Sequence, residues 1–199
     1  MHHGTEPPGA GRVAPGRREG RVMDRHIFVI GMPGCGKSSL SKKVASNMGL
    51  NYVDTDQRIE AAFGCPTAQI FERYGEEAFR NAETNTLIQL TREPGSLVST
   101  GGGMVLRENN REIMRNHGII VLIDRPLDEI MGDIKLNRRP LLAQKGLPEV
   151  ERLYHERIET YRSIADAVLD NGHGYYAGVN GMEKLIRTLF NIPANPDRR

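Results

Sequence analysis

The stretch from Gly31 to Ser38 reads Gly-Met-Pro-Gly-Cys-Gly-Lys-Ser and fits the phosphate-binding P-loop pattern G-x-x-x-x-G-K-S/T. An apolar, β-branched run over residues 25–30 precedes it, and apolar residues at helical spacing follow over residues 38–48. A strand, a loop and a helix are therefore expected. Glycines let backbone N–H groups approach phosphate oxygens, and the amide-rich start of the helix holds the anion. The sequence predicts a nucleoside triphosphate site.

Consecutive residues of this loop are expected to contact the triphosphate. Lys37 would reach the β- and γ-phosphates as a point charge, and the Ser38 hydroxyl would coordinate the accompanying magnesium ion. The expected nucleotide-binding residues are Gly34, Cys35, Gly36, Lys37, Ser38 and Ser39. The competing interpretation is an ordinary turn, because the chain has 22 glycines, but the flanking strand and helix favour phosphate binding.

The composition excludes several other classes of protein. A formal net charge of +2, with no basic run interleaved with aromatic residues, gives no electrostatic footprint for nucleic acid. The longest apolar run, Ile119 to Ile123, is too short to span a membrane. Two cysteines, Cys35 and Cys65, are too few for a disulfide framework or a metal site, which favours the cytoplasm. We expect a monomer with one domain and with neither nucleic-acid nor membrane partners.

Both ends of the chain differ from its middle. Residues 1–24 are rich in Gly and Pro and carry four arginines but few apolar residues. They lack the apolar stretch of about 7–15 residues that a secretory signal requires. We predict a disordered extension, with Met23 as an alternative start, followed by a domain over residues 25–191 and a flexible tail over residues 192–199.

The rest of the chain alternates strand and helix patterns. The expected strands are residues 25–30, 51–54, 96–100, 119–123 and 167–169, and the expected helices are residues 38–48, 56–63, 67–74, 76–91, 109–116, 127–136, 148–164 and 182–190. Strands separated by crossover helices predict an α/β fold with a five-stranded parallel sheet and helices on both faces. Ligand sites in such sheets lie at the carboxyl ends of the strands.

Chemically active residues follow two of these strands. Asp54 and Asp56 come after the second strand, where one carboxylate can face a magnesium shell and the other a second substrate. For Asp56, a helix N-cap is an equally good interpretation. Gly101, Gly102 and Gly103 follow the third strand, either as an ordinary mobile loop or as bare backbone that a ligand approaches closely.

Arg80 and Glu83 stand three residues apart on one face of the predicted helix over residues 76–91. On an exposed surface such a pair contributes about 0.3 kcal/mol. In a cleft, Glu83 would instead fix the planar fork of Arg80 for two-point binding of a substrate carboxylate, worth about 1.5–3 kcal/mol. The sequence leaves both interpretations open.

Taken together, these motifs resemble shikimate kinase over residues 26–190. The resemblance rests on the P-loop, Asp54-Thr55-Asp56, Phe79-Arg80 with Glu83, the three glycines, Arg139-Pro140-Leu141-Leu142, and Arg157 with Tyr161-Arg162. It implies a three-layer P-loop kinase fold with substrate-binding helices and a mobile lid over about residues 137–148. It also implies transfer of the ATP γ-phosphoryl group to the 3-hydroxyl of shikimate, a step of aromatic amino-acid biosynthesis.

The resemblance also assigns roles to residues of this chain. Asp56, Arg80, Arg157 and the three glycines Gly101, Gly102 and Gly103 would hold shikimate, with both arginines on its carboxylate. Lys37, Asp56 and Arg139 would be the catalytic residues, with Arg139 swinging from the lid onto the phosphates of ATP. Magnesium would be coordinated by Ser38 directly and by Asp54 through water. Phe71 and Phe79 match pocket-lining positions, although both are equally compatible with the core.

One position departs from the family pattern. Gly132 stands where the family often carries an arginine that packs on adenine, and Lys135 lacks a planar head. The adenine contacts are therefore open, with His173, Tyr175 and Tyr176 as alternatives to plain surface residues.

Two alternative functions remain open. The first is another small-molecule kinase, for gluconate or a nucleoside monophosphate, although paired arginines with Asp56 favour an acidic polyol. The second is a nucleotide-dependent switch, although the guanine signature N-K-x-D is absent from the sequence.

Overall fold

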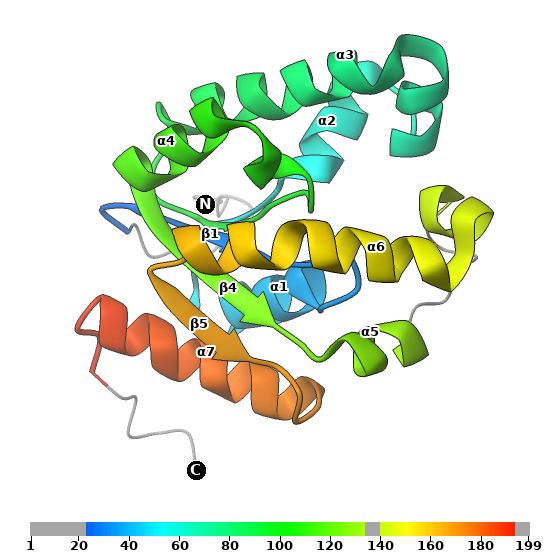
Figure 1. Ribbon diagram of the computed structural model, residues 1–199. Helices are drawn as coiled ribbons and strands as arrows, with labels where there is room; N and C mark the ends of the chain where they lie inside the picture. The colour runs from blue at the N-terminus through cyan, green and yellow to red at the C-terminus, as the bar shows by residue number, and fades with distance from the viewer. Residues whose placement is uncertain (1–22, 134–139, 194–199) are drawn as a thin grey trace, which may run out of the picture.

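The computed structural model describes residues 23–133 and 140–193, which form a three-layer α/β structure (Figure 1). The strands are β1 (His26–Ile30), β2 (Tyr52–Asp54), β3 (Leu97–Ser99), β4 (Gly118–Asp124) and β5 (Ala167–Asp170). They pair in parallel as one sheet with the order β2-β3-β1-β4-β5. The predicted five-stranded parallel sheet is confirmed.

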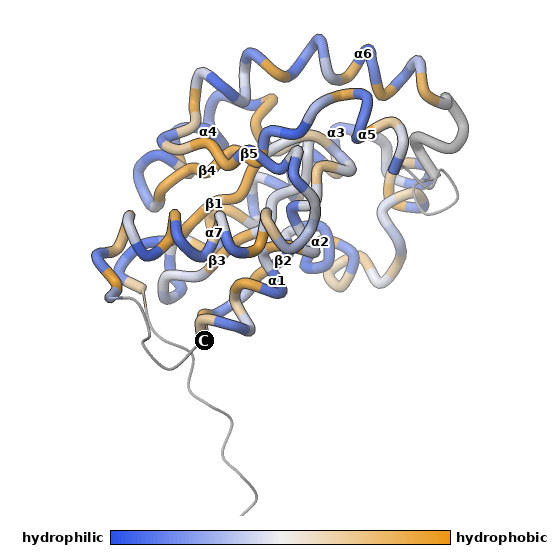
Figure 2. Tube along the Cα trace, turned by 90° about the horizontal axis from the view of Figure 1, so that it is seen from below, coloured by the Kyte–Doolittle hydropathy of each residue, from blue (hydrophilic) through white to orange (hydrophobic). Residues whose placement is uncertain are grey.

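Strand β1 lies at the centre of the sheet, and four of its five residues are apolar. All five of its residues are buried, and Phe28 is in register with Val98 of β3 on one side and Ile120 of β4 on the other. Figure 2 shows the apolar residues of β1 and β4 in the interior of the molecule. The loop that follows β1 therefore opens in the middle of the carboxyl edge of the sheet, where ligands bind in such folds.

Helices cover both faces of the sheet, as predicted (Figure 1). They are α1 (Lys37–Met48), α2 (Thr55–Phe63), α3 (Thr67–Leu90), α4 (Glu108–His117), α5 (Leu127–Asp133), α6 (Pro140–Ile164) and α7 (Tyr175–Leu189), with a short 3₁₀ helix, η1 (Met104–Leu106). Helices α1 and α7 pack together on one face, and α4 and α6 pack on the other. Helix α3 packs against both α2 and α4, so α2 and α3 stand beside the carboxyl edge.

Two long helices are interrupted at glycines. Helix α3 has non-helical angles at Gly75 (φ 80°, ψ 171°), which confirms the predicted division into residues 67–74 and 76–91. Helix α6 is broken at Gly146, just before Pro148. The predicted loop is wrong for residues 140–145, which are helical; their sequence contains Leu, Ala, Gln and Lys, all strong helix formers. Residues 134–139, with the first part of the predicted lid, lie outside the described residues.

Helix α7 begins at Tyr175, so the predicted start at residue 182 is wrong. Its first turns carry Gly178 and Gly181, which have low helix propensity and indicated a loop. Tertiary packing explains both glycines. A Cβ on Gly178 would overlap the side chain of Asn171, and one on Gly181 would lie 2.9 Å from Leu169 Cδ1.

The described chain ends pack on the domain. Met23 is buried and forms an isolated antiparallel bridge with Gly95, so it belongs to the core rather than to the predicted extension. Ile192 packs on the core near the other end. Residues 1–22 and 194–199 lie outside the described residues, so the extension and the tail remain predictions. In the described part of the chain, no helix is long and apolar enough to cross a bilayer.

The contact between Met23 and Gly95 generates a stability prediction. A Cβ on Gly95 would lie 2.6 Å from Arg25 O and closer still to Met23 O, both of them backbone atoms that cannot rotate away. Gly95→Ala should lower the free energy of unfolding by about 1–3 kcal/mol, as overpacking does. Urea denaturation measures this. Gly132→Ala is the control, since a Cβ there meets nothing within 4 Å; equal stability of the two variants would contradict the prediction.

Candidate active site

The P-loop has the backbone geometry that its glycines predict. Gly31, Gly34 and Gly36 have φ angles of 142°, 91° and 103°, in a region that residues with a Cβ rarely adopt. Lys37 is buried, and its Nζ donates hydrogen bonds of 2.8 Å to the carbonyl oxygens of Gly31 and Met32. The loop therefore curls around the lysine ammonium group at the start of α1.

Cys35 and Ser39 make contacts within the P-loop itself. Cys35 is fully buried, with its Sγ 3.9 Å from Lys37 Nζ. Ser39 Oγ donates to Gly36 O over 3.0 Å. Asn171, which follows β5, donates from Nδ2 to Cys35 O over 2.9 Å. The segment after β5 thus holds the P-loop in place, a contact that the sequence did not reveal because the residues are 136 positions apart.

Oxygen atoms gather beside the P-loop where the predicted metal residues lie. Ser38 Oγ is 3.2 Å from Ser99 Oγ, at the end of β3. The Tyr52 hydroxyl donates to Asp54 Oδ2 over 3.1 Å and lies 3.4 Å from Ser38 O. Burial and the Asp54 carboxylate raise the pKa of Tyr52, so this hydroxyl stays protonated and donates. The structure thus brings Ser38 and Asp54 together.

Asp54, rather than Asp56, is the N-cap of α2. Asp54 Oδ1 accepts hydrogen bonds from the backbone N–H groups of Asp56 and Gln57 over 3.1 and 3.2 Å. The interpretation of Asp56 as the cap is therefore wrong, and its side chain is directed elsewhere. A Cβ on Gly101 would lie 2.5 Å from Asp56 Oδ1, so Asp56 faces the loop after β3.

The three glycines after β3 form the centre of the site, because they contact every other part of it. A Cβ on Gly101 would lie 3.1 Å from Glu83 Oε1, and one on Gly102 would lie 3.1 Å from Pro33 Cγ in the P-loop. A Cβ on Gly103 would overlap the Arg80 guanidinium group, 2.7 Å from Cζ. Gly101 and Gly103 are buried and Gly102 is half-buried, which favours bare backbone at the site over an ordinary exposed loop.

Arg80 and Glu83 form a buried pair, which decides between the two interpretations of the sequence. Arg80 Nη1 donates to Glu83 Oε2 over 2.8 Å, and their side chains are 12% and 1% exposed. Burial raises the pKa of Glu83, and the nearby Arg80 opposes this rise. Burial acts to lower the pKa of Arg80, but Glu83 and Glu76 outweigh it and raise the pKa. The interpretation as an exposed surface pair is therefore wrong, and carboxylate binding by Arg80 stays a prediction.

Arg157 and Tyr161 approach the same loop from α6. The Tyr161 hydroxyl donates to Gly102 O over 2.5 Å, and Arg157 Nη1 donates to the same oxygen over 3.5 Å. Two buried polar atoms in this site, Arg157 Nε and Glu83 Oε1, find no hydrogen-bond partner among the described residues. Such atoms are rare in folded proteins, and a polar ligand at this place would satisfy them.

The apolar side of the site comes from α3. The rings of Phe71 and Phe79 lie 4.7 Å apart, and the Arg80 guanidinium carbon lies 5.9 and 5.6 Å from their centroids. Phe79 is buried. The two rings therefore belong to a small apolar cluster and lie against the arginine, whereas their role in lining the substrate pocket stays a prediction.

The assembled site matches a known family. A family model described as "Shikimate kinase" matches residues 33–187 of the chain. The chain belongs to the shikimate kinase family. It is therefore an ATP-dependent kinase, and ATP is its co-substrate.

Curated relatives and solved structures agree with this assignment. A shikimate kinase from Clostridium beijerinckii is 37% identical over 173 residues, covering 87% of this chain and 100% of the relative. One from Aromatoleum aromaticum is 37% identical over 166 residues, covering 82% and 95%. The structure of shikimate kinase from Acinetobacter baumannii in complex with shikimate has a TM-score of 0.76 and 27% identity, covering 86% and 96% of the two chains.

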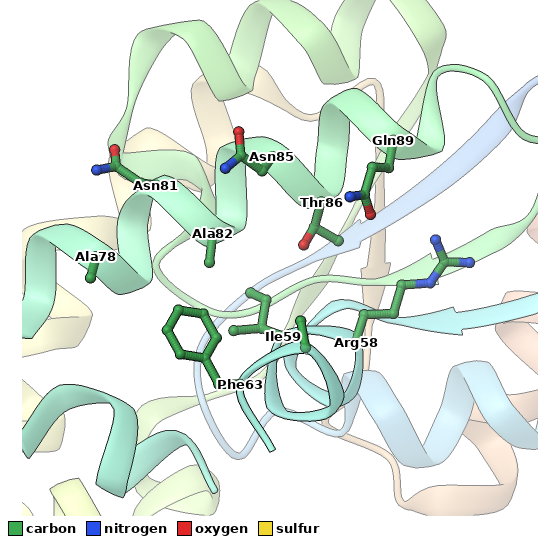
Figure 3. Close-up of a pocket in the computed structure, with 10 residues that line it drawn as sticks. Arg58, Ile59, Phe63, Ala78, Asn81, Ala82, Asn85, Thr86 and Gln89 are labelled. Carbon is green, nitrogen blue, oxygen red and sulfur yellow. The ribbon is translucent and has the colours of Figure 1, made fainter. Parts of the chain in front are cut away.

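A separate pocket lies on the other side of α3. It has a volume of about 440 Å³ and runs between α2 and α3 (Figure 3), lined by Arg58, Ile59, Ala62, Phe63, Ala78, Asn81, Ala82, Asn85, Thr86 and Gln89. At about 100° per residue, this row faces away from Arg80 and Glu83. None of the predicted site residues lines it, so the pocket is distinct from the candidate site of the shikimate kinase family described above.

Two predicted features of the nucleotide side stay untested. Arg139 lies outside the described residues. A Cβ on Gly132 would meet nothing within 4 Å, and the adenine contacts stay open. Tyr175 and Tyr176 are exposed at the start of α7, with their rings 5.5 Å apart.

The burial of Glu83 predicts a pH-dependent difference in stability. Because its pKa is raised in the folded state, protonated Glu83 favours folding, and this contribution is lost as the pH rises from the ordinary value through the folded-state pKa. The stability of Glu83→Gln relative to the wild type should therefore rise between about pH 4 and pH 8, because only the wild type loses this contribution. Urea midpoints of both proteins over this range measure the difference; a difference that stays constant or falls as the pH rises would contradict the prediction.

Proposed function

We propose that this chain is a shikimate kinase, which transfers the γ-phosphoryl group of ATP to the 3-hydroxyl of shikimate and releases shikimate 3-phosphate and ADP. This step belongs to the route to chorismate and the aromatic amino acids. The observation that carries the proposal is the convergence of Arg80, Arg157 and Asp56 on one glycine loop that also touches the P-loop. The free thiols of Cys35 and Cys65 support a cytoplasmic location.

The two arginines fit the carboxylate of the acceptor. Arg157 Nε is buried and lacks a partner among the described residues, so a ligand oxygen there would satisfy it. Arg80 lies against Gly103 of the same loop and is held by Glu83. A carboxylate between two guanidinium groups gains charge-assisted hydrogen bonds to both. This arrangement favours an acidic polyol over a nucleoside monophosphate as acceptor.

Asp56 and Glu83 fit the hydroxyl side of the acceptor. Asp56 Oδ1 and Glu83 Oε1 both face Gly101, and carboxylate oxygens accept hydrogen bonds from hydroxyl groups. Asp56 orients the 3-hydroxyl toward the γ-phosphorus and takes up its proton. The new bond joins the 3-oxygen to the γ-phosphorus, and the bond to the β–γ bridging oxygen breaks, leaving its electron pair on ADP. Phosphoryl transfer has a loose transition state, so positioning and charge neutralisation supply most of the rate.

The P-loop side supplies the positive charge. Lys37 exchanges its contacts with Gly31 O and Met32 O for the β- and γ-phosphates of ATP. We propose that Arg139 joins it from the lid, although Arg139 lies outside the described residues. Closure of that lid would exclude water that otherwise hydrolyses ATP.

The oxygen donors beside the P-loop fit a magnesium ion. Magnesium prefers hard oxygen ligands and keeps several waters, and in kinases it binds one or two protein groups together with the phosphates. Ser38 Oγ and the Asp54 carboxylate offer such a set, with Asp54 acting through water. Among the described residues, no group of three or more His, Cys, Asp or Glu side chains could hold a metal by itself. When bound, magnesium would neutralise the phosphate charge.

The proposal is tested by measuring ADP release in a coupled assay with shikimate, gluconate or AMP as the acceptor. Only shikimate should give turnover well above the rate of ATP hydrolysis without acceptor. Turnover with gluconate alone would favour the other small-molecule kinase, and ATP binding without turnover on any acceptor would favour a nucleotide switch.

Lys37→Met tests the P-loop assignment. Losing one preorganised positive charge at the phosphates should lower kcat by about 10²- to 10³-fold. Lys42→Met, which changes an exposed lysine of the same helix, is the matched control and should keep normal turnover. Near-normal kcat in Lys37→Met would contradict the assignment.

Gly103→Ala tests the acceptor site without removing a charge. The new Cβ would displace the flexible end of Arg80, so the fold should survive while the carboxylate contact weakens. The KM for shikimate should rise about 10- to 100-fold, the value of a charge-assisted hydrogen bond, with the KM for ATP unchanged. A rise in the KM for ATP instead would place Arg80 on the nucleotide side.

A further inference from the structure

The donors of Arg80 are already occupied by carboxylates of the protein itself. Nη1 donates to Glu83 Oε2 over 2.8 Å. On the side-on edge of the guanidinium group, Nε and Nη2 both donate to one oxygen of Glu76, Oε1, over 3.2 and 3.0 Å. Through the two donors on this edge, an arginine can bind a substrate carboxylate with two parallel hydrogen bonds. In the free protein, Glu76 therefore stands where such a ligand would bind.

The two glutamates differ in how tightly the fold holds them. The side chain of Glu83 is 1% exposed, so it cannot leave Arg80 without stranding a buried charge. The side chain of Glu76 is 66% exposed, so water can solvate its carboxylate as soon as the contact breaks. Exposed ion pairs contribute little to stability. Glu83 is thus a permanent partner of Arg80, and Glu76 is a replaceable one.

The backbone next to Glu76 has room to move. Glu76 follows Gly75 directly, where α3 departs from helical angles, and a Cβ on Gly75 would meet nothing within 4 Å. Glu76 therefore stands at the start of the second part of α3, beside a position that no side chain crowds. Withdrawal of Glu76 needs no rearrangement of the buried part of the site.

We propose that Glu76 is an internal competitor for the acceptor carboxylate: it occupies the Nε and Nη2 edge of Arg80 in the free enzyme and leaves when the acceptor binds. The inference rests on the proposed role of Arg80 in holding the acceptor. Any ligand that uses this edge must therefore outcompete a tethered carboxylate. An acid that also pairs with Arg157 can displace Glu76, whereas a ligand without a carboxylate gains nothing from Arg80. Glu76 therefore contributes to acceptor specificity.

The competing role for Glu76 is permanent positioning of Arg80, and the two roles predict opposite signs. If Glu76 competes, then removing its charge frees the edge and strengthens binding of the acceptor. If Glu76 only positions, then removing its charge loosens Arg80 and weakens binding. The adjacent Glu77 offers a matched control, because it is 80% exposed and pairs with Arg107 rather than with Arg80.

The test is titration calorimetry of shikimate with the wild type, Glu76→Gln, Glu76→Ala and Glu77→Gln, together with the KM for shikimate in the coupled assay. Both Glu76 variants should bind shikimate about two- to fivefold more tightly, the range expected from loss of one exposed ion pair. Their KM for ATP should not change, and Glu77→Gln should match the wild type. Thermal unfolding of each protein checks that all four are folded.

Each remaining outcome overturns the inference. Unchanged or weaker binding of shikimate to both Glu76 variants, with normal binding to the wild type, would overturn the competitor role and leave the proposed function standing. Equal tightening in Glu77→Gln would show a general charge effect rather than competition at Arg80. No binding of shikimate to any of the four proteins would overturn the competitor role and the proposed function together.

Discussion

The parallel sheet is the constraint on which the rest of the structure depends, because it turns the carboxyl ends of all strands to one edge. With β1 between β3 and β4, the P-loop opens in the middle of this edge and contacts the segments that follow β3 and β5. The glycine loop after β3 then touches the P-loop through Pro33, α2 through Asp56 and α3 through Arg80. A side chain at any of these glycines would push two binding surfaces apart, so bare backbone is what lets phosphate donor and acceptor meet.

Charge burial at this edge supports binding rather than stability. Glu83 is held next to Arg80 at the cost of a raised pKa, and Arg157 Nε is left without a partner among the described residues. Both are unfavourable in the empty protein, and under the proposed function a bound carboxylate and hydroxyl groups would relieve them. The exposed Glu76 meanwhile occupies one edge of Arg80.

Much of this could be predicted from the sequence, for physical reasons that differ between residues. Continuous apolar runs predicted the buried strands. The glycines of the P-loop pattern predicted positive φ angles, which leave few alternative conformations for that loop. The contact of Tyr161 with Gly102 and that of Asn171 with Cys35 join residues far apart in the chain, so no local pattern shows them. The N-cap role of Asp54 and the early start of α7 were missed because capping geometry and tertiary packing of glycines overrode local propensity.

The most direct test of the central claim is a crystal structure of the protein with shikimate bound. The account predicts the carboxylate within hydrogen-bond distance of the guanidinium groups of Arg80 and Arg157. It also predicts the 3-hydroxyl beside Asp56, directed toward the P-loop. Shikimate in the pocket between α2 and α3, or anywhere remote from both arginines, would contradict the account.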